Sequence, residues 1–453
     1  MTREPDLQRY DAIIIGAGPA GGEVASRLAR AGKSVAIVES RGYGGVCPLR
    51  GCNPKKLLLS GAETVASAQN MHTRGVTGEL HVDWNELQIF KNFFVDPIPE
   101  AAENHYREQG ATTLHGLARF TGPNTVAVQS EEGALQLQGE HILVTPGMTP
   151  RQLDIPGSQH LHISDDFLEL ERLPQRLVFI GGGFVAFEFA HIAARAGAQV
   201  TILCRSTPLK RFDPILVDDL VQATRHAGVD VRLNAPTHEV KEIKDGFRVL
   251  FGKGQSVDTD AVFNVAGRVP DLAPLQLDAA NVAHGPGGVS VNQFMQSVSN
   301  PKVYCTGDAA DTPFALTPTA TIESAAAAEN ILHGNHSQVD HNGIPYVCFT
   351  IPPLAACGES ESQLQARGAE YKVMHRDLSQ VFAWKRLGEG HGRSRVFVDE
   401  KHDRVLGAHI FGHNAEEMIN LFGLIIRNDI PLSQVRSTVW AYPTCGYELK
   451  YMV

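Results

Sequence analysis

The sequence has few cysteines and no long apolar run, and each shortage excludes a class of protein. Its 453 residues include seven cysteines, an odd and sparse set that does not suit the disulfide framework of a secreted protein. We therefore expect a cytoplasmic chain with reduced thiols. No apolar stretch reaches the ~18 residues of a membrane-spanning helix, so no membrane partner is expected. The opening MTREPDLQRY lacks the apolar core of a signal peptide.

The sequence also lacks an excess of basic residues. Its net charge of -10 argues against nucleic acid and anionic membranes as partners. With 43% hydrophobic and 20% charged residues, the composition is that of an ordinary globular protein. The length predicts about two to four domains.

What the sequence does contain is an internal repeat. Residues 11–39 and 177–204 each read as an apolar strand, a glycine-rich turn, a helix and a second apolar strand. This order begins a βαβ unit that binds a dinucleotide, with the pyrophosphate at the helix N-terminus. The alternative, a turn that binds nothing, is weakened because each turn follows a strand and opens a helix. The fingerprint positions are Gly16, Gly18 and Gly21 in the first copy, and Gly181, Gly183 and Ala186 in the second.

The two copies differ at the end of their second strand. The first strand ends in Glu39, whose carboxylate suits the hydroxyls of a ribose. The second ends in Cys204 and continues with the basic residues Arg205, Lys210 and Arg211. Cations at this place suit a 2'-phosphate, so the second copy predicts NADPH and the first an ADP group without that phosphate. The alternative for the second copy is a solvated basic loop.

The stretch GGVCPLRGCNPKK holds a close pair of cysteines, Cys47 and Cys52. A zinc site needs a second pair of ligands that the sequence does not offer, and a structural disulfide is disfavoured in a cytoplasmic chain. We therefore interpret the two as a redox pair and expect no metal. In a regular helix they would be separated by a rise of ~7.5 Å, whereas a disulfide needs Cα atoms within ~7 Å. Pro48 and Gly51 are expected to distort the segment so that the pair can close.

Two lysines follow the cysteine pair. Asn53 is expected to cap a helix with Pro54 at its first position, which places Lys55 and Lys56 in the first turn. Cations there oppose the helix dipole at a cost of ~0.3 to 1 kcal/mol each. A nearby thiolate or a reduced flavin would offset that cost.

The rest of the chain predicts further strands and a domain of a different class. Strands are expected within 142–157, 261–271 and 303–318. Residues 333–341 read as a linker whose His333, His336 and His341 are better explained as solvated than as metal ligands. Alternating patterns such as SRVFVDE and RVLGAHIFG predict an antiparallel sheet, accompanied by a helix over AEEMINLFGLIIRN.

These motifs together resemble the FAD-dependent pyridine nucleotide-disulfide oxidoreductases, the family of glutathione reductase, lipoamide dehydrogenase and mercuric reductase. The resemblance follows the order of the chain: GAGPAGG with VAIVE, then GGVCPLRGCNPKK, GGGFVAFE, AGRVPD, TGDAA and VLGAHIFGHNAEEM. It implies an α/β fold with two Rossmann-like domains and a C-terminal α+β dimerisation domain. The implied boundaries are 1–150 with 271–335 for FAD, 151–270 for NAD(P)H and 336–453 for dimerisation.

The resemblance also implies roles for individual residues. Asp308 would bind the FAD ribityl chain, Lys55 would lie near flavin N5 and pair with Glu188, and Phe184 would be the aromatic gate over the flavin. Cys52 would be the flavin-proximal thiol and Cys47 the interchange thiol that attacks substrate. Electrons would pass from NADPH through FAD to this disulfide and then to substrate, in a homodimer whose subunits complete each other's active site. Further cofactor contacts are implied for Gly45, Lys56, Gly147 and Gly267.

The C-terminal segment WAYPTCGYELKYMV departs from the family pattern. Tyr442 stands where the family has the acid–base His, Tyr447 stands where it has the Glu, and Glu448 is one position further. A phenol with a reference pKa of about 10 does not readily take a proton from a thiol near pH 7, although it can still donate a hydrogen bond. Cys445 is either an additional thiol near Cys47 across the dimer or a small filler beside a tight turn.

The sequence therefore predicts an NADPH-dependent disulfide reductase with an unusual acceptor. The positions that would hold glutathione are Pro19 and Ser26, which weakens glutathione disulfide and favours another small disulfide or a persulfide. The alternative is a metal-ion reductase of the mercuric type, or a quinone reductase, that works without the His. A non-enzymatic subunit of a larger complex is disfavoured because the sequence carries no lipoyl or linker domain.

Overall fold

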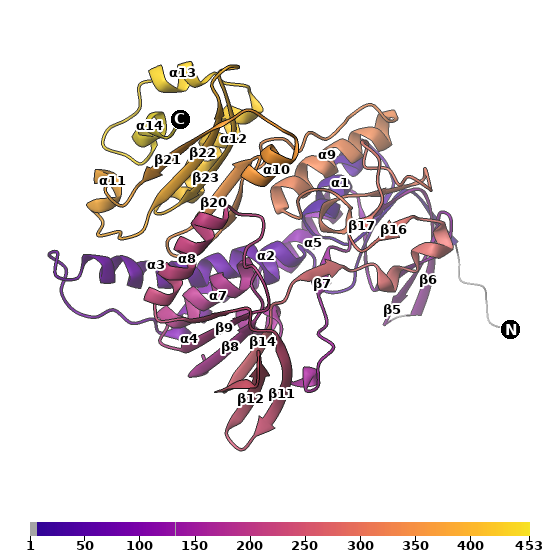
Figure 1. Cartoon of the computed structure of the whole chain (residues 1–453). Coiled ribbons are helices and arrows are strands. Elements are labelled where there is room, and N and C mark those ends of the chain that lie inside the picture. Colours follow the sequence, from indigo (N-terminus) through magenta and orange to yellow (C-terminus); the bar gives the residue numbers. More distant parts are fainter. Residues whose placement is uncertain (1–6, 132) are drawn as a thin grey trace. The chain divides into compact units, whose positions relative to one another are not determined.

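The computed structural model describes residues 7–131 and 133–453, which form two compact units (Figure 1). The first unit takes the described residues of 1–56, 89–151 and 268–341, and the second takes 57–88, 152–267 and 342–453. The chain thus enters each unit several times. The sequence predicts three domains, and this division stays a prediction, since the structure separates into two units.

A mostly parallel sheet forms the centre of the first unit. Its strand order is β3-β2-β1-β6-β5-β4, and β18 also pairs with β6. The first repeat supplies β1, helix α1 and β2, as predicted, and α1 packs against α9. The bounds are β1 (Leu7–Ile15), α1 (Pro19–Arg30), β2 (Val35–Glu39), β3 (Thr112–His115), β4 (Leu117–Gly122), β5 (Thr125–Ser130), β6 (Gly133–Val144), β18 (Val303–Cys305) and α9 (Thr317–His333).

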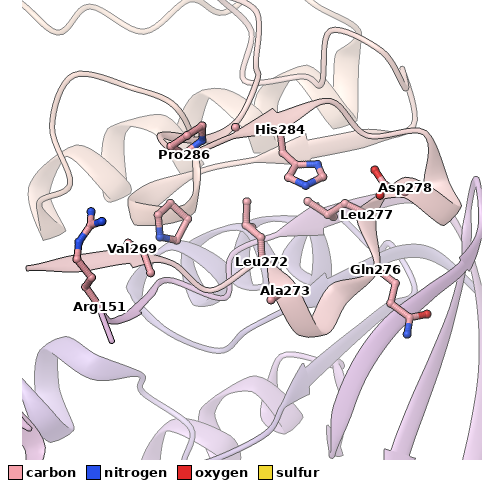
Figure 2. A pocket seen from close by; sticks show the side chains of 11 residues that line it. Arg151, Val269, Leu272, Ala273, Gln276, Leu277, Asp278, His284 and Pro286 are labelled. Carbon is pink, nitrogen blue, oxygen red and sulfur yellow. The ribbon is translucent and has the colours of Figure 1, made fainter. Parts of the chain in front are cut away.

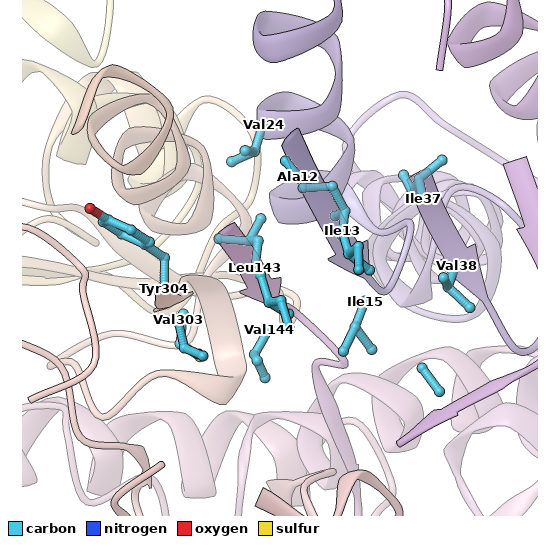
Figure 3. Packing of buried hydrophobic residues seen from close by; sticks show 14 of the residues in the cluster. Ala12, Ile13, Ile15, Val24, Ile37, Val38, Leu143, Val144, Val303 and Tyr304 are labelled. Carbon is cyan, nitrogen blue, oxygen red and sulfur yellow. The ribbon is translucent and has the colours of Figure 1, made fainter. Parts of the chain in front are cut away.

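The core of this unit lies around the central strands. Ile14 of β1 is in register with Ile37 of β2 on one side and Leu143 of β6 on the other. Apolar side chains of β1, β2, β6 and β18 are buried together with Val24 of α1 (Figure 3). Strands buried on both faces explain the continuous apolar runs in the sequence, because no side of such a strand meets water.

The second unit contains the second repeat. Its parallel sheet has the order β10-β9-β8-β14. A cluster of buried aromatic side chains packs against this sheet, and in it Phe167 stacks on Phe189 with ring centroids 4.3 Å apart. A separate antiparallel sheet has the order β11-β12-β13. The bounds are β8 (Arg176–Ile180), α7 (Phe184–Arg195), β9 (Gln199–Cys204), α8 (Pro214–His226), β10 (Asp230–Leu233), β11 (Thr237–Ile243), β12 (Gly246–Phe251), β13 (Gln255–Thr259) and β14 (Ala261–Asn264).

The C-terminal part of the second unit is the predicted antiparallel sheet. Its order is β19-β20-β23-β22-β21, and helix α12 packs on β20 and β23. This arrangement confirms the α/β fold class with two Rossmann-like sheets and a C-terminal α+β part. The bounds are β19 (Tyr346–Cys348), β20 (Leu354–Gly358), β21 (Lys372–Asp377), β22 (Arg393–Asp399), β23 (Arg404–Phe411) and α12 (Ala415–Arg427).

Shorter elements connect these sheets. No described helix is both long and apolar enough to cross a membrane. The remaining bounds are α2 (Val46–Arg50), α3 (Cys52–Met71), α4 (Trp84–Val95), α5 (Ile98–Glu108), β7 (Met148–Pro150), η1 (Ser158–His160), α6 (Ser164–Leu168), β15 (Arg268–Pro270), η2 (Ala273–Leu275), η3 (Leu277–Ala280), β16 (His284–Gly285), β17 (Gly288–Val289), η4 (Gly307–Ala309), α10 (Glu361–Ala366), α11 (Phe382–Lys385), α13 (Leu432–Ser437), η5 (Gly446–Glu448) and α14 (Leu449–Met452).

The predicted linker begins slightly later than expected, because helix α9 extends through His333. His336 hydrogen-bonds the Gly334 carbonyl at 2.8 Å, and His341 pairs with Glu323 at 2.9 Å. Within the described residues, no group of three or more His, Cys, Asp or Glu side chains is arranged to hold a metal ion. His341 is packed against α9 and is not solvated as expected, while the expectation that this stretch binds no metal stays a prediction.

Candidate redox-active site

The residues predicted to bind FAD follow the ends of parallel strands. Gly16 follows β1, Glu39 ends β2, Gly147 lies three residues after β6 and Asp308 three residues after β18. Because β1, β2, β6 and β18 are parallel neighbours, their carboxyl ends meet at one edge of the sheet. This edge is where α/β folds bind nucleotides.

The first glycine fingerprint leaves room for a pyrophosphate. Gly16 has φ +100°, and a Cβ there would overlap the Thr145 carbonyl, while a Cβ at Gly21 would overlap the Gly16 carbonyl. Gly18 is different, since its φ of -75° suits any residue and its Cβ would meet only Gly45 at 3.7 Å. Neither the backbone conformation nor the packing of the chain requires glycine at position 18, whereas a ligand that approaches the backbone closely would require it. The first turn of α1 has no acidic residue, which suits an anion.

The two acids at this edge are held differently. Glu39 is buried, and its carboxylate accepts hydrogen bonds from the backbone N–H of Ala17 at 2.9 Å and of Arg41 at 2.8 Å. It is therefore fixed at the glycine-rich turn. Burial raises the pKa of Asp308, and the charge of Arg268 lowers it in part. An acid held in a partly buried place suits hydroxyl ligands, so these residues fit the ribose and ribityl groups of FAD.

The cysteine pair spans a break between two helices. Cys47 lies in α2, which ends at Arg50, and α3 begins at Cys52. The break is at Gly51, whose φ of -146° and ψ of -110° are not helical. Pro48 lies inside α2 and does not break it, which corrects half of the expected distortion. The predicted cap at Asn53 is also wrong, because the helix already includes Cys52.

Both cysteines are free thiols, and each affects the other's proton. The hydrogen bond from Cys52 lowers the pKa of Cys47 to about 6, and the same contact raises the pKa of Cys52. A pair that shares one proton in this way carries one negative charge at neutral pH. Cys47 is then the thiolate, which is the protonation state an attacking sulfur requires.

Thr317 is a site residue that the sequence interpretation missed. Its hydroxyl hydrogen-bonds the thiols of Cys47 and Cys52, and each contact lowers the pKa of that thiol. Thr317 is the first residue of α9, so the positive end of that helix lies beside the pair and favours a thiolate. A Thr-Pro start before an alanine-rich run signals a helix N-terminus, but nothing in the sequence places it at Cys47.

Lys55 and Glu188 are both buried, each in a different unit. The hydrogen bond with Cys47 and burial raise the pKa of Cys52, and the charge of Lys55 offsets part of that rise. Glu188 lies on α7, and its carboxylate accepts a hydrogen bond from the backbone N–H of Phe349 at 2.7 Å. The ion pair expected between Lys55 and Glu188 remains a prediction.

The second nucleotide motif repeats the strand-end arrangement. Gly181 follows β8 with φ +152°, and a Cβ there would overlap the Val265 carbonyl. Gly183 has φ -90° and open space where a Cβ would lie. Gly267, after β14, also has open space there, but its φ is +114°. Phe184 opens α7 with 53% of its surface exposed, which leaves it accessible to a ligand. These residues fit a dinucleotide at the carboxyl edge of the sheet.

The end of β9 lacks the carboxylate of an NAD site. The Cys204 side chain is buried against Gly182, where a Cβ would overlap its sulfur, and the thiol donates to the Ser206 carbonyl at 2.9 Å. Cys204 is thus taken up by packing. Arg205 and Lys210 are exposed immediately beyond it.

The C-terminal segment offers an aromatic group and no free carboxylate. Tyr442 is 68% exposed and meets Tyr447 edge to face with centroids 4.9 Å apart. The hydrogen bond with Tyr451 lowers the pKa of the Tyr447 phenol, and Lys450, 4.0 Å from the centroid of that ring, lowers it further. Glu448 is buried and paired with Arg376 at 2.7 Å. The family's His–Glu pair therefore has no equivalent here.

Cys445 is placed inside the C-terminal core. It is 7% exposed, and the Asn414 amide donates to its sulfur at 3.7 Å. Burial raises the pKa of this thiol. The structure thus favours the filler interpretation of Cys445 over that of an additional reactive thiol.

One cavity of the first unit carries none of the predicted site residues. It measures about 350 Å³ and lies between β7, β15 and the turns that follow β15 (Figure 2). Its lining is apolar at Val269 and Leu272, with Arg151 and His284 at its sides. This cavity has no part in the site described above.

Two strand–glycine turn–helix motifs and a close pair of free cysteines are the arrangement expected of a flavoprotein oxidoreductase. Comparison with known families agrees. Residues 10–330 match the pyridine nucleotide-disulphide oxidoreductase family, and residues 344–453 match its dimerisation domain. The chain belongs to this family of FAD-dependent oxidoreductases, which use NAD(P)H, and the second match supports a homodimer.

Relatives of known function extend over nearly the whole chain. A dihydrolipoyl dehydrogenase of Staphylococcus aureus is 29% identical over 96% of this chain and 94% of its own. A glutathione reductase of Burkholderia cepacia is 28% identical over 98% of each chain. Among solved structures, the Cu(II) complex of the HOCl-induced flavoprotein disulfide reductase RclA from Escherichia coli is similar, with a TM-score of 0.89, 27% identity and coverage of 98% of this chain and 99% of that chain.

Proposed function

We propose that this protein is an NADPH-dependent flavoprotein disulfide reductase whose acceptor is a small disulfide or persulfide other than glutathione disulfide. The observation that carries the proposal is the cysteine pair. Cys47 has a pKa of about 6 because Cys52 and Thr317 hydrogen-bond its sulfur, so it is a thiolate at neutral pH. FAD, when bound, would supply the two electrons that reduce this pair.

The chemistry of the pair follows from thiol–disulfide exchange. The Cys47 thiolate attacks one sulfur of the acceptor, its S–S bond breaks, and one thiolate leaves. Cys52 then loses its proton and attacks the Cys47 sulfur, which re-forms the internal disulfide and releases the second thiolate. The leaving thiolates take one proton from Cys52 and one from water. Tyr442 is an exposed phenol that can donate a hydrogen bond to a leaving sulfur, and it stands where the family has an imidazole base.

The missing base limits the choice of acceptor. Without a His to take up and return the proton, a leaving thiol of ordinary pKa departs slowly, whereas a sulfur of low pKa needs less assistance. This favours persulfides and disulfides of acidic thiols. The preference for NADPH is supported by Arg205 and Lys210 beyond β9 and by the burial of Cys204.

The proposal is tested with purified enzyme, both nucleotides and a panel of disulfides and persulfides. We expect turnover with NADPH that exceeds turnover with NADH and that is lost in Cys47→Ser and Cys52→Ser. Anaerobic titration with each nucleotide, followed by absorbance, should show a long-wavelength thiolate–flavin band after two electrons. If Cys47→Ser retains full activity with the best acceptor, the proposal is wrong.

A second candidate function is a reductase whose acceptor is a metal ion or a quinone. Two observations favour it: the C-terminal segment lacks the His, and the similar RclA structure is a Cu(II) complex. A thiolate such as Cys47 is a good ligand for soft metal ions. Steady turnover of Cu(II), Hg(II) or a quinone at rates far above those of every disulfide would support this candidate. Loss of the metal activity, but not the quinone activity, in Cys47→Ser would separate the two.

A further inference from the structure

A carboxylate with no role in the thiol chemistry lies behind the turn that carries Asp308. Glu323 is on α9, and its side chain is 0% exposed. One oxygen accepts a hydrogen bond from the backbone N–H of Gly307 at 2.8 Å, and the other is 2.9 Å from Nε2 of His341. The carboxylate thus bridges the turn before Asp308 and the last residue of the first unit.

The turn that Glu323 holds needs support. Gly307 has φ +70°, and a Cβ there would lie 3.1 Å from the Ala20 side chain and 3.3 Å from Ala320. The turn is therefore confined between α1 and α9. A neighbouring hydrogen bond of 2.9 Å joins the buried hydroxyls of Thr306 and Ser324, so two polar contacts from α9 reach consecutive residues of the turn.

The burial of this acid is unfavourable unless it is offset. Burial raises the pKa of Glu323, and its contacts with His341, Thr312 and Gly307 lower it in part. The surrounding helix is rich in alanine, where an apolar residue would pack without this cost. A buried carboxylate in an alanine-rich helix is explained when its hydrogen bonds hold a neighbouring group in place, here the Gly307 N–H.

We infer that Glu323 and His341 are positioning residues that fix the Gly307–Asp308 turn from behind and thereby set the affinity for FAD. His341 orients the carboxylate, the carboxylate holds the Gly307 N–H, and Asp308 follows in the turn. The sequence suggested that His341 belongs to a solvated linker. It can orient the carboxylate because the chain after α9 folds back and brings the imidazole to Glu323. The inference rests on Asp308 contacting FAD and not on the identity of the acceptor.

The test measures FAD affinity and not turnover. Apoprotein of the full chain is prepared from wild type, Glu323→Ala, Glu323→Gln, His341→Ala and a control, Glu329→Ala, which removes a partly exposed carboxylate from the same helix. The dissociation constant is read from the quenching of FAD fluorescence. The flavin midpoint potential and the melting temperature of each apoprotein are measured alongside.

Glu323→Ala is expected to raise the dissociation constant about tenfold or more, as for loss of one hydrogen bond to a charged group. Glu323→Gln, which keeps an acceptor for Gly307, should lie between Glu323→Ala and wild type, and His341→Ala should weaken binding less than Glu323→Ala. The control should remain within twofold of wild type. If Glu323→Ala does not fold, Glu323→Gln and His341→Ala carry the test.

Two results would overturn the inference. One is an FAD affinity in the Glu323 variants equal to that of the control. The other is a loss of apoprotein stability that accounts for the whole change, with no shift in midpoint potential and no recovery in Glu323→Gln, since a purely structural group would act in this way. Neither result bears on the disulfide panel, so failure here and failure of the proposed function are distinguishable.

Discussion

Arg376 donates a hydrogen bond to Glu448 at 2.7 Å, and the same guanidinium lies 4.9 Å from the centroid of the Tyr451 ring. Glu448 is the carboxylate closest in sequence to the position of the family's acid, yet it is buried and already paired. The acid–base pair has therefore not simply moved by one residue. The carboxylate has a structural partner, and Tyr442 contacts the Tyr447 ring instead.

Restoring the base alone should do little. Tyr442→His introduces an imidazole but no carboxylate to orient it, so we expect less than about a tenfold gain in kcat/KM for the best disulfide. Tyr442→His combined with Tyr447→Glu restores both family positions and should exceed the product of the two single effects. The readout is kcat/KM against pH, with Tyr451→Phe as control. A full gain from Tyr442→His alone would mean that Glu448 can leave Arg376.

The reactivity of the reduced pair should depend on pH. Because the pKa of Cys47 is about 6, the thiolate fraction and the rate of alkylation rise as pH increases through 6 and then level off. Cys52→Ala and Thr317→Ala each remove a hydrogen bond to the Cys47 sulfur, so the midpoint should move up toward the ordinary thiol value of about 8.5. Iodoacetamide labelling followed by mass spectrometry gives the rate and the site. Labelling of Cys52 before Cys47 would contradict the assignment.

Nucleotide preference should depend on Arg205. Arg205→Ala removes one charge-assisted contact to a 2'-phosphate, for which we expect about a 10- to 100-fold loss of kcat/KM with NADPH and little change with NADH. The control is Lys253→Ala, which removes an exposed cation in the turn between β12 and β13. Equal losses with both nucleotides would show that Arg205 does not recognise the phosphate.

A buried ion pair should dominate the stability of the second unit. Asp213 pairs with Arg395 and also caps α8 by accepting from the N–H of Ile215 at 3.0 Å. Asp213→Asn keeps the cap but removes one of the two carboxylates paired with Arg395, since Glu361 remains at 2.9 Å, and we expect a cost of about 1.5 to 3 kcal/mol. Asp213→Ala also loses the cap, which adds about 1 kcal/mol. The free energy of unfolding of each variant is measured with denaturant. The exposed Asp218→Asn is the control and is expected to leave this free energy unchanged. Equal losses in Asp213→Ala and Asp213→Asn would contradict the capping role.

The parts of this structure that depend on local sequence could be predicted. Strand, glycine turn and helix appear where the two fingerprints place them, because glycine conformation and apolar periodicity are properties of neighbouring residues. The helix α3 begins two residues before the predicted first position at Pro54. Its first-turn N–H groups need no intrahelical partner, so Pro54 is tolerated inside the helix and does not mark its beginning.

Contacts between distant segments could not be predicted. Thr317 is 270 residues from Cys47, and Arg376 is 72 from Glu448. No periodicity or motif records that two such segments meet, since their meeting depends on how whole elements pack. The partner of a titratable group decides its chemistry, so the lowered pKa of Cys47 and the pairing of Glu448 with Arg376 became visible only in three dimensions.

The packing of Cys204 against Gly182 restricts how the cofactor preference of this enzyme can be redesigned. The usual route to NAD preference is an acid at the end of the second strand. Here the Cys204 sulfur fills the space beneath the glycine turn, and a longer, charged side chain would press on the backbone that receives the nucleotide. Under the proposed preference for NADPH, a laboratory switch of cofactor therefore has to begin at Arg205 and Lys210. An acid introduced first at position 204 is expected to disturb the glycine turn before a new preference arises.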